Sequence, residues 1–325
     1  MSFEKPPFYL YLNYVCNQHC VFCASPHTNG GESIREIPWK ILERELQEEC
    51  LENAPVILSG GEPTCYGELW HLLDHLSTHT RFIDVMTNGL LLAEDHFASK
   101  LLGYPIACLS IPIYGFEETH DRLVGHRSHQ TLLAALERIN AAPVEMNLKL
   151  LITRQNYAEL PELLRFLVNR YGSRPHYTLN TLIYGDNARQ SDSWIRLCEV
   201  RSVVSEMLSY GFGHDLKLSL SFVPACALTS EFLSARLLEF FALSRSKHTQ
   251  QPGSTVRIIT PSKLRFETVR EDVYIPSVCE ACGVREFCLR VHLTAEDAGE
   301  RELGLQPIQL IGGKACFVGE IRPAD

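Results

Sequence analysis

Short apolar runs alternate with amphipathic helical patterns from residue 8 to residue 185, and this alternation limits the fold more than any other feature. Each run is too short for a helix and is followed by apolar residues at helical spacing. Strands of this kind, apolar on both faces, belong to a parallel sheet covered by helices. The pattern repeats about six times, which fits either an open doubly wound sheet or a partial barrel.

The alternation ends near Asp186. Beyond it, apolar residues at helical spacing predict helices over residues 192–210 and 230–244, with a short strand between them. We therefore expect an α/β domain over residues 1–205 and a smaller α+β domain over residues 206–325.

Charge and composition exclude several kinds of partner. Lys and Arg number 30 against 39 Asp and Glu, which gives a net charge of −9, whereas a nucleic-acid or anionic-membrane surface needs clustered basic residues. No apolar run approaches the ~20 residues of a transmembrane helix, and the N-terminus lacks the regions of a secretory signal. We therefore expect a cytoplasmic protein that has neither nucleic acid nor membrane as its partner.

Cysteine spacing gives the first indication of function. Six of the twelve cysteines form two tight clusters: Cys16, Cys20 and Cys23 near the start, and Cys279, Cys282 and Cys288 near the end. In a cytoplasmic chain such clusters are more typical of metal binding than of disulfides. Three thiolates need a further ligand. The first cluster therefore predicts either a zinc site completed by His19 or His27, or an iron–sulfur cluster with one iron open to a small molecule.

Four short motifs follow four successive predicted strands. They are Cys-x3-Cys-x2-Cys at residues 16–23, Gly-Gly-Glu-Pro at 60–63, Thr-Asn-Gly at 87–89 and Ser-Ile-Pro at 110–112. The carboxyl ends of strands are where α/β proteins place ligands. Two glycines let the backbone come close to a ligand, and a carboxylate suits an ammonium group. Together with Phe22, which precedes the last cysteine, these motifs resemble those of the radical S-adenosylmethionine superfamily, and the resemblance covers residues 8–185.

The resemblance implies a fold, a cofactor and a reaction. The fold would be a partial (βα)6 TIM-like barrel, followed by a small α+β domain that carries an auxiliary iron–sulfur cluster. Cys16, Cys20 and Cys23 would hold a [4Fe-4S] cluster whose open iron binds S-adenosylmethionine. Reductive cleavage would yield a 5′-deoxyadenosyl radical that takes hydrogen from a substrate. The implied cofactor-binding residues are Gly60, Gly61 and Glu62 at the methionine amino group, Asn88 and Ser110 at the ribose or carboxylate, and Phe22 and Pro63 in the same motifs.

The second cluster, Cys279-x2-Cys282-x5-Cys288, also needs a fourth ligand. By spacing alone it fits a structural zinc knuckle. It resembles the C-terminal extension of radical S-adenosylmethionine enzymes that is called SPASM with two auxiliary clusters and twitch with one. His292 stands where the SPASM pattern has a further cysteine, and the resemblance implies a single auxiliary [4Fe-4S] cluster. Its expected ligands are Cys226, Cys279, Cys282 and Cys288, with Cys316 or His292 as alternatives to Cys226.

Cys65 lies two residues after Pro63, near the expected opening of the active site. The resemblance implies a role for its thiol as hydrogen-atom donor to a substrate radical, as in the peptide epimerases of the superfamily.

Residues 120–136 resemble a stretch common in the peptide-modifying branch. The resemblance therefore implies a maturase that crosslinks, epimerises or oxidises a ribosomally made peptide, with a flavodoxin or ferredoxin as electron donor. A radical enzyme acting on a small molecule, by dehydrogenation or in cofactor biosynthesis, is one alternative. A zinc-stabilised, non-catalytic binding protein is another. Because the first strand begins near residue 8, we expect no separate peptide-recognition domain before it.

Overall fold

The computed structural model of the protein describes residues 7–23, 35–182, 191–236, 255–270, 279–280, 282–283, 308–311 and 314–317. Packing divides the chain into two compact units. Unit 1 consists of Met1–Lys149 and Gly253–Glu271, and unit 2 consists of Leu150–Pro252 and Asp272–Asp325. The division into domains at residues 1–205 and 206–325 stays a prediction.

The strands in the described part of the chain form two sheets. Their bounds are β1 Phe8–Tyr11, β2 Val56–Ser59, β3 Ile83–Met86, β4 Ile106–Ile113, β5 Glu145–Ile152, β6 His176–Thr181, β7 Lys217–Ser221, β8 Thr255–Thr260, β9 Lys263–Arg270, β10 Ile308–Ile311 and β11 Lys314–Phe317. The larger sheet has the order β7-β6-β5-β4-β3-β2-β1-β8-β9, and β10 and β11 form the smaller one.

Strand order distinguishes between the two arrangements that the sequence pattern allows. Strands β1 to β7 follow one another in chain order, without the reversal that defines a doubly wound sheet. Strands β1 to β4 pair in parallel, and so do β6 and β7. The two end strands of the order are β7 and β9, so the sheet is open. This confirms the predicted α/β fold with an open parallel sheet of the partial-barrel kind.

Strands β8 and β9 form a hairpin that the strand–helix pattern does not predict. β8 pairs in parallel with β1, with Phe8 opposite Arg257, and β9 pairs with β8 in antiparallel fashion. The rings of Phe8 and Phe266 meet edge to face at 5.4 Å, and Arg257 forms an ion pair with Glu49. These contacts join a segment near the end of the sequence to the first strand.

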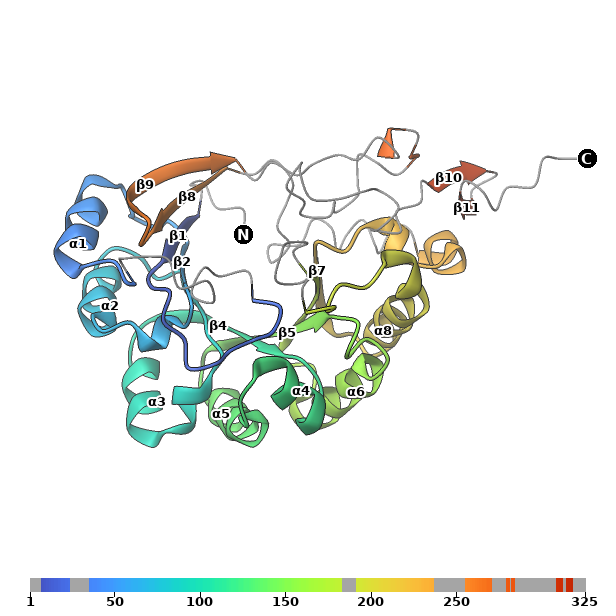
Figure 1. Ribbon diagram of the computed structural model, residues 1–325, viewed down its shortest axis with the longest axis horizontal. Helices are drawn as coiled ribbons and strands as arrows, with labels where there is room; N and C mark the ends of the chain where they lie inside the picture. Colours follow the sequence, from blue (N-terminus) through green and yellow to red (C-terminus); the bar gives the residue numbers. More distant parts are fainter. Residues whose placement is uncertain are drawn as a thin grey trace, which may run out of the picture. The chain divides into compact units, whose positions relative to one another are not determined.

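The helices of unit 1 cover one face of its strands (Figure 1). They are α1 Trp39–Glu48, α2 Leu69–Ser77, α3 Asp95–Leu102 and α5 His129–Ala141, whereas the short helix α4 Glu117–Val124 packs against α5. Buried and half-buried side chains alternate along β1, β2 and β3, as expected where helices cover one face of a sheet. Within the described part of the chain, no helix has the length and apolar character of a membrane span.

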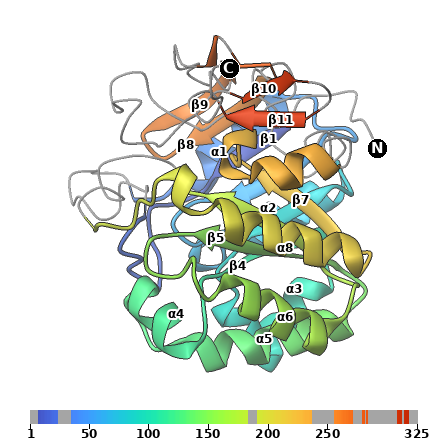
Figure 2. The ribbon, with the colours of Figure 1, turned by 90° about the vertical axis from the view of Figure 1, so that its right-hand side faces the viewer.

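In unit 2, helices α6 (Leu160–Tyr171) and α8 (Arg201–Gly213) lie side by side (Figure 2). The helix predicted over residues 192–210 therefore begins later than expected. The reason is that the preceding residues are held in another conformation: the Arg154 N–H donates to the Ser193 carbonyl oxygen at 2.9 Å, and the Gln155 side chain donates to the Ser193 hydroxyl at 3.2 Å.

Candidate active site

Three of the four sequence motifs meet at one edge of the sheet, whereas the fourth, at residues 110–112, lies within β4 and not after it as predicted. The Cys16–Cys23 loop follows β1, residues 60–63 follow β2 and residues 87–89 follow β3, while Ser110 lies within β4. Because these four strands are parallel neighbours, their carboxyl ends lie side by side. Unit 1 thus brings together the residues that the sequence singled out in its first half.

Gly60 and Gly61 allow two backbone segments to approach each other closely. The Gly61 N–H donates to the Asn13 carbonyl oxygen and the Glu62 N–H to the Val15 carbonyl oxygen, both at 2.7 Å. A Cβ on Gly60 would lie 2.8 Å from the Asn13 oxygen, and one on Gly61 would lie 2.4 Å from the Val15 oxygen. The close approach that the sequence analysis assigned to a ligand is therefore made, in this structure, to the backbone leading into the cysteine loop.

The Glu62 carboxylate is buried and accepts four hydrogen bonds. Its Oε1 accepts from the Thr64 N–H at 3.0 Å, the Thr64 hydroxyl at 2.6 Å and the Thr87 hydroxyl at 2.7 Å. Its Oε2 accepts from the Asn88 N–H at 2.7 Å. Glu62 thereby caps the short 3-10 helix η2 (Pro63–Cys65), whose first residue is the proline of the motif. Burial raises the pKa of Glu62, and the donors oppose that rise.

The Asn88 side chain joins this network to the cysteine loop. Its Nδ2 donates to Asn17 Oδ1 at 2.6 Å and lies 3.9 Å from the Cys16 sulfur. The Cys16 sulfur also accepts from the Gln18 N–H at 3.4 Å. Glu62, the end of β3 and the first cysteine are therefore connected by direct hydrogen bonds.

The three thiols of the loop lie close enough together to affect one another's pKa. Burial raises the pKa of Cys16 to about 11 and raises the pKa of Cys20 further, and Cys23 adds to both rises. Among the described residues, no three His, Cys, Asp or Glu side chains stand at metal-ligand separations, so binding of a metal centre requires the thiols to turn toward one another. The donor set fits an iron–sulfur cluster, because thiolates are the soft ligands such clusters take and metal binding displaces their protons.

The C-terminal end of α4 forms backbone hydrogen bonds with the cysteine loop. The His19 N–H donates to the Val124 carbonyl oxygen at 2.9 Å, and the Val21 N–H donates to the Leu123 carbonyl oxygen at 3.0 Å. Gly125, at φ 64°, follows the helix, and a Cβ there would lie 2.9 Å from the His19 carbonyl oxygen. This contact gives a physical role to residues 120–125, which the sequence analysis noted only as part of a resemblance.

Phe22 begins a row of buried rings behind the loop. Its ring meets the ring of Tyr114 at 5.1 Å, and Tyr114 lies 5.6 Å from the ring of His120. Burial raises the pKa of Tyr114, and the three cysteines raise it as well, which places this phenol close to them. Burial lowers the pKa of His120 to about 4. Tyr114 was missed by the sequence analysis, although its position at the end of the fourth strand is the signal that identified the other motifs.

Ser110 lies apart from the Glu62 network. Its hydroxyl donates to Asp84 Oδ2 at 3.1 Å and accepts from Asn147 Nδ2 at 3.3 Å, so it joins β3, β4 and β5. Asp84 and Asn147 were not among the predicted site residues. Each is a polar residue within a predominantly apolar strand, Asp84 in β3 and Asn147 in β5, and this contrast is the sequence signal that could have identified them.

Cys65 faces the cysteine loop. Its sulfur accepts a hydrogen bond from the Asn17 backbone, while burial, Glu62 and Cys16 raise its pKa to about 11. The thiol is therefore protonated at neutral pH, as a hydrogen-atom donor must be.

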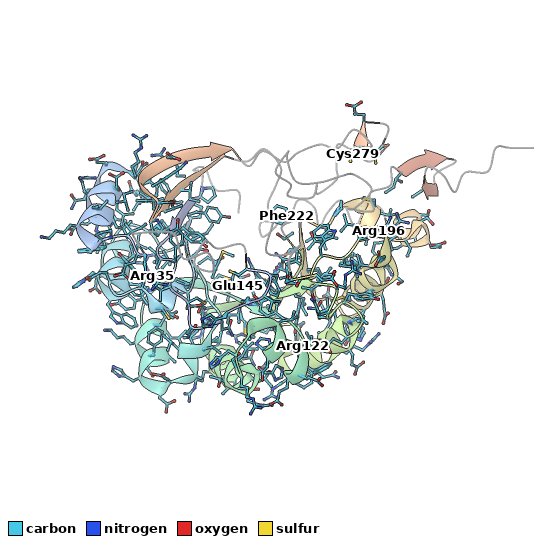
Figure 3. The ribbon with its side chains drawn as sticks, in the orientation of Figure 1. Arg35, Arg122, Glu145, Arg196, Phe222 and Cys279 are labelled. Atoms are coloured by element: carbon cyan, nitrogen blue, oxygen red, sulfur yellow. The ribbon has the colours of Figure 1, made fainter. Side chains whose placement is uncertain are left out.

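Two of the C-terminal cysteines form one turn. The Cys282 N–H donates to the Cys279 carbonyl oxygen at 3.2 Å, and the Cys282 sulfur accepts from the Ile308 N–H at 3.4 Å (Cys279 is labelled in Figure 3). Gly283 donates in turn to the Ile308 carbonyl oxygen at 2.7 Å. The start of β10 is thereby tied to this turn.

Cys226 is buried in the 3-10 helix η5 (Ala225–Ala227), and its carbonyl oxygen accepts from Arg201 Nε at 2.8 Å. Three other predicted or alternative ligands lie outside the described residues: Cys288, His292 and the side chain of Cys316. The ligand set of an auxiliary cluster stays a prediction.

Known proteins resemble this chain over its first half. Residues 10–167 match the family model of the Radical SAM superfamily. The mycofactocin maturase MftC of Mycolicibacterium smegmatis is 30% identical over 186 residues, which cover 56% of this chain and 45% of MftC. The PqqA peptide cyclase of Bradyrhizobium diazoefficiens is 26% identical over 164 residues, which cover 49% of this chain and 42% of the cyclase. The match thus spans less than half the length of either curated relative.

Among solved structures, SuiB from Streptococcus suis is similar in fold. The crystal structure of SuiB bound to its precursor peptide SuiA gives a TM-score of 0.56 at 16% identity, covering 78% of this chain and 57% of SuiB. SuiB bound to S-adenosylmethionine gives the same TM-score at 17% identity. At this identity the likeness establishes the fold, which agrees with the open sheet. The chain is therefore similar to the radical SAM superfamily over residues 10–167.

Proposed function

We propose that this chain is an enzyme that binds a [4Fe-4S] cluster and S-adenosylmethionine and uses them to modify a peptide. The observation that carries the proposal is the hydrogen-bonded connection of the Cys16–Cys23 loop, Asn88 and Glu62 at one edge of the sheet. When bound, the cluster supplies the electron that cleaves S-adenosylmethionine to methionine and a 5′-deoxyadenosyl radical.

In this proposal Cys16, Cys20 and Cys23 hold the cluster as thiolates. The backbone N–H of Gln18 and the side-chain amide of Asn88 both point to the Cys16 sulfur and stabilise negative charge there. Hydrogen bonds to cluster sulfurs raise the reduction potential, so these two donors make the cluster easier to reduce.

Glu62 receives the methionine amino group. Its Oε2 accepts one described hydrogen bond, from Asn88, whereas a carboxylate oxygen has two lone pairs. An ammonium group can therefore share Oε2 with the Asn88 N–H. Gly60, Gly61 and Pro63 complete the cofactor-binding set by shaping the backbone around this carboxylate.

Phe22 and Ser110 take more distant roles in the same set. Phe22 packs on Tyr114 and keeps water from the back of the cysteine loop. Ser110, whose hydroxyl is hydrogen-bonded to Asp84 on the neighbouring strand, would contact the ribose or carboxylate of S-adenosylmethionine.

A peptide substrate is supported by the relatives. One is named a maturase and another a peptide cyclase, and SuiB was solved with a precursor peptide. A small-molecule substrate is the alternative that the experiment below decides. The proposal includes a flavodoxin or ferredoxin as electron donor and a cytoplasmic location, because thiolate ligands need a reducing compartment.

The proposal extends to a single auxiliary [4Fe-4S] cluster in a SPASM or twitch-like segment. Cys226, Cys279, Cys282 and Cys288 are its proposed ligands, and Cys279 and Cys282 already share one turn. Cys65 is proposed as the hydrogen-atom donor, because its protonated thiol faces the cysteine loop.

The test is iron and sulfide analysis after anaerobic reconstitution, together with an assay for 5′-deoxyadenosine. Wild type should carry about eight iron atoms per chain, and a variant with Cys16, Cys20 and Cys23 all changed to alanine about four, with no 5′-deoxyadenosine formed. Cys50→Ala, which removes an exposed cysteine outside both clusters, is the control and should behave as wild type. Zinc without iron would contradict the proposal.

The substrate class is tested by adding short peptides encoded beside the gene to the reconstituted enzyme. A mass change in one peptide, dependent on S-adenosylmethionine, supports a peptide maturase. Turnover of small metabolites with every such peptide unchanged favours the alternative.

A further inference from the structure

Strands β6 and β7 of unit 2 carry polar side chains on the face of the sheet that is turned away from α8. In their parallel pairing, Thr178 lies opposite Ser219, and the two hydroxyls meet at 2.7 Å. Two residues later, Asn180 lies opposite Ser221. The next face is apolar: Leu218 packs against a glycine of α8, where an added Cβ would lie 2.3 Å from it. Because side chains alternate along a strand, the four polar ones point away from that helix.

The side-chain oxygen of Asn180 is buried and accepts no hydrogen bond from any residue in the described part of the chain. Most buried polar atoms in folded proteins have a partner, so this atom is an acceptor suited to a donor from a ligand. Thr178 and Ser219 are buried, whereas Asn180 is half-buried and lies near the carboxyl end of β6. The carboxyl ends of parallel strands are where α/β proteins place ligands.

Phe222, labelled in Figure 3, follows β7 directly and has a left-handed backbone conformation with φ 56°. A bulky side chain in this conformation is strained, and strain of this kind gathers at functional sites. The Thr181 hydroxyl donates to the Phe222 carbonyl oxygen at 2.5 Å and so fixes the turn. Phe222 is half-buried and adjoins Ser221, the residue opposite Asn180.

We call Asn180, Ser221 and Phe222 the strand-end site. Its side chains are an amide, a hydroxyl and a phenyl ring, and none of them carries a charge. The cation of β7, Lys217, lies at the opposite end of that strand, where its ammonium donates to the Arg174 carbonyl oxygen at 3.1 Å. A neutral acceptor near an aromatic ring suits a neutral N–H group that adjoins an apolar surface.

We infer that the strand-end site binds a backbone N–H and the adjoining apolar side chain of the peptide substrate. The inference rests on the proposed function and deepens it, because it assigns residues to peptide recognition. Asn180 accepts the hydrogen bond, Phe222 packs on the apolar side chain, and no bond is formed or broken at the site. In peptide recognition, main-chain hydrogen bonds supply affinity and side-chain contacts supply specificity. The adenine of S-adenosylmethionine also presents N–H groups beside a flat ring, and the experiment distinguishes the two ligands.

The experiment measures two dissociation constants on reconstituted full-length protein. Fluorescence anisotropy gives the first, for a fluorescein-labelled form of the peptide encoded beside the gene that wild type modifies, and equilibrium dialysis gives the second, for S-adenosylmethionine. Asn180→Leu removes the acceptor at similar size and should weaken peptide binding about tenfold. The dissociation constant for S-adenosylmethionine should match wild type, which also shows that the variant is folded.

Phe222→Gly separates the ring from the turn. Glycine adopts the left-handed conformation without strain, so this variant keeps the turn and loses only the phenyl ring. It should weaken peptide binding about tenfold. The control is Asn53→Gly, which replaces another residue of positive φ (57°) at an exposed position of unit 1 and should leave peptide affinity unchanged.

Wild-type peptide affinity in either site variant would overturn the inference. In Phe222→Gly it would show that the left-handed residue serves only the turn toward Cys226. Loss of S-adenosylmethionine affinity, with or without loss of peptide affinity, would assign the site to adenine and overturn the inference as well. If wild type modifies none of the peptides encoded beside the gene, the proposed peptide function fails, which is distinct from failure at the strand-end site alone.

Discussion

Replacing Gly61 by alanine should destabilise the protein strongly. The added Cβ would lie 2.4 Å from the Val15 carbonyl oxygen and 3.0 Å from the Tyr14 carbonyl carbon, and these backbone atoms cannot move aside as a flexible side chain would. Overpacking of this kind costs about 1–3 kcal/mol. Separating the segments also weakens the hydrogen bonds from Gly61 and Glu62, each worth about 0.5–1.5 kcal/mol. We therefore expect the free energy of unfolding to fall by about 2–6 kcal/mol.

Urea unfolding of the metal-free protein, followed by circular dichroism, measures this loss. The control is Gly213→Ala at the end of α8, where a Cβ would meet nothing within 4 Å and alanine should be neutral or stabilise by up to about 1 kcal/mol. Gly61→Ala should also bind less iron on reconstitution, because Val15 directly precedes Cys16. A Gly61→Ala stability within about 1 kcal/mol of the control would refute the reasoning that this glycine is required by a backbone contact.

Three further substitutions test other parts of the site. Burial lowers the pKa of His120 from 6.5 to about 4, so between these pH values the unfolded chain binds a proton that the folded chain does not. Wild type should therefore lose up to about 3 kcal/mol of free energy of unfolding as the pH falls from 6.5 to 4. The variant His120→Asn should lose less over the same range, and His126→Asn, at an exposed histidine, is the control. Glu62→Gln should lower the free energy of unfolding, measured in urea, by about 1–3 kcal/mol. The amide of glutamine either places its N–H against another buried donor or replaces a charge-assisted hydrogen bond by a weaker one. Gly125→Ala should lower the free energy of unfolding by more than the about 1–2 kcal/mol that a left-handed alanine costs, because a Cβ at Gly125 would also lie 2.9 Å from the His19 carbonyl oxygen. A loss within that range in urea unfolding would show that the contact with the cysteine loop is unimportant.

Local pattern was sufficient to predict the strand–helix units and the edge of the sheet where the motifs gather. The first strand, for example, is a short apolar run that ends before the cysteine loop, although only its alternate side chains are fully buried. Periodicity alone did not exclude a doubly wound sheet, because it describes each element and not the order in which the strands pair. That order became known only from the pairing of β1 with β2 and β8.

The sequence pattern does not predict which side chains from distant segments contact one another. Glu62 was predicted as a ligand for an ammonium group, but its described partners include Thr87 and Asn88, which lie 25 and 26 residues further along the chain. A carboxylate and two polar residues at that separation carry no local signal. The β8–β9 hairpin is a similar case, since β8 pairs with β1 across most of the chain length.

The cysteine loop and the end of α4 satisfy each other's backbone groups. A helix leaves its last four carbonyl oxygens without partners inside the helix, and a loop that presents three cysteines leaves N–H groups without partners. In this chain the carbonyls of Leu123 and Val124 accept from the N–H groups of Val21 and His19, at 3.0 and 2.9 Å. Ordering of the loop therefore depends on the helix ending at Val124, which Gly125 ensures by its left-handed conformation. The position of the cysteines is thus determined as much by residues a hundred positions later as by the spacing of the cysteines themselves.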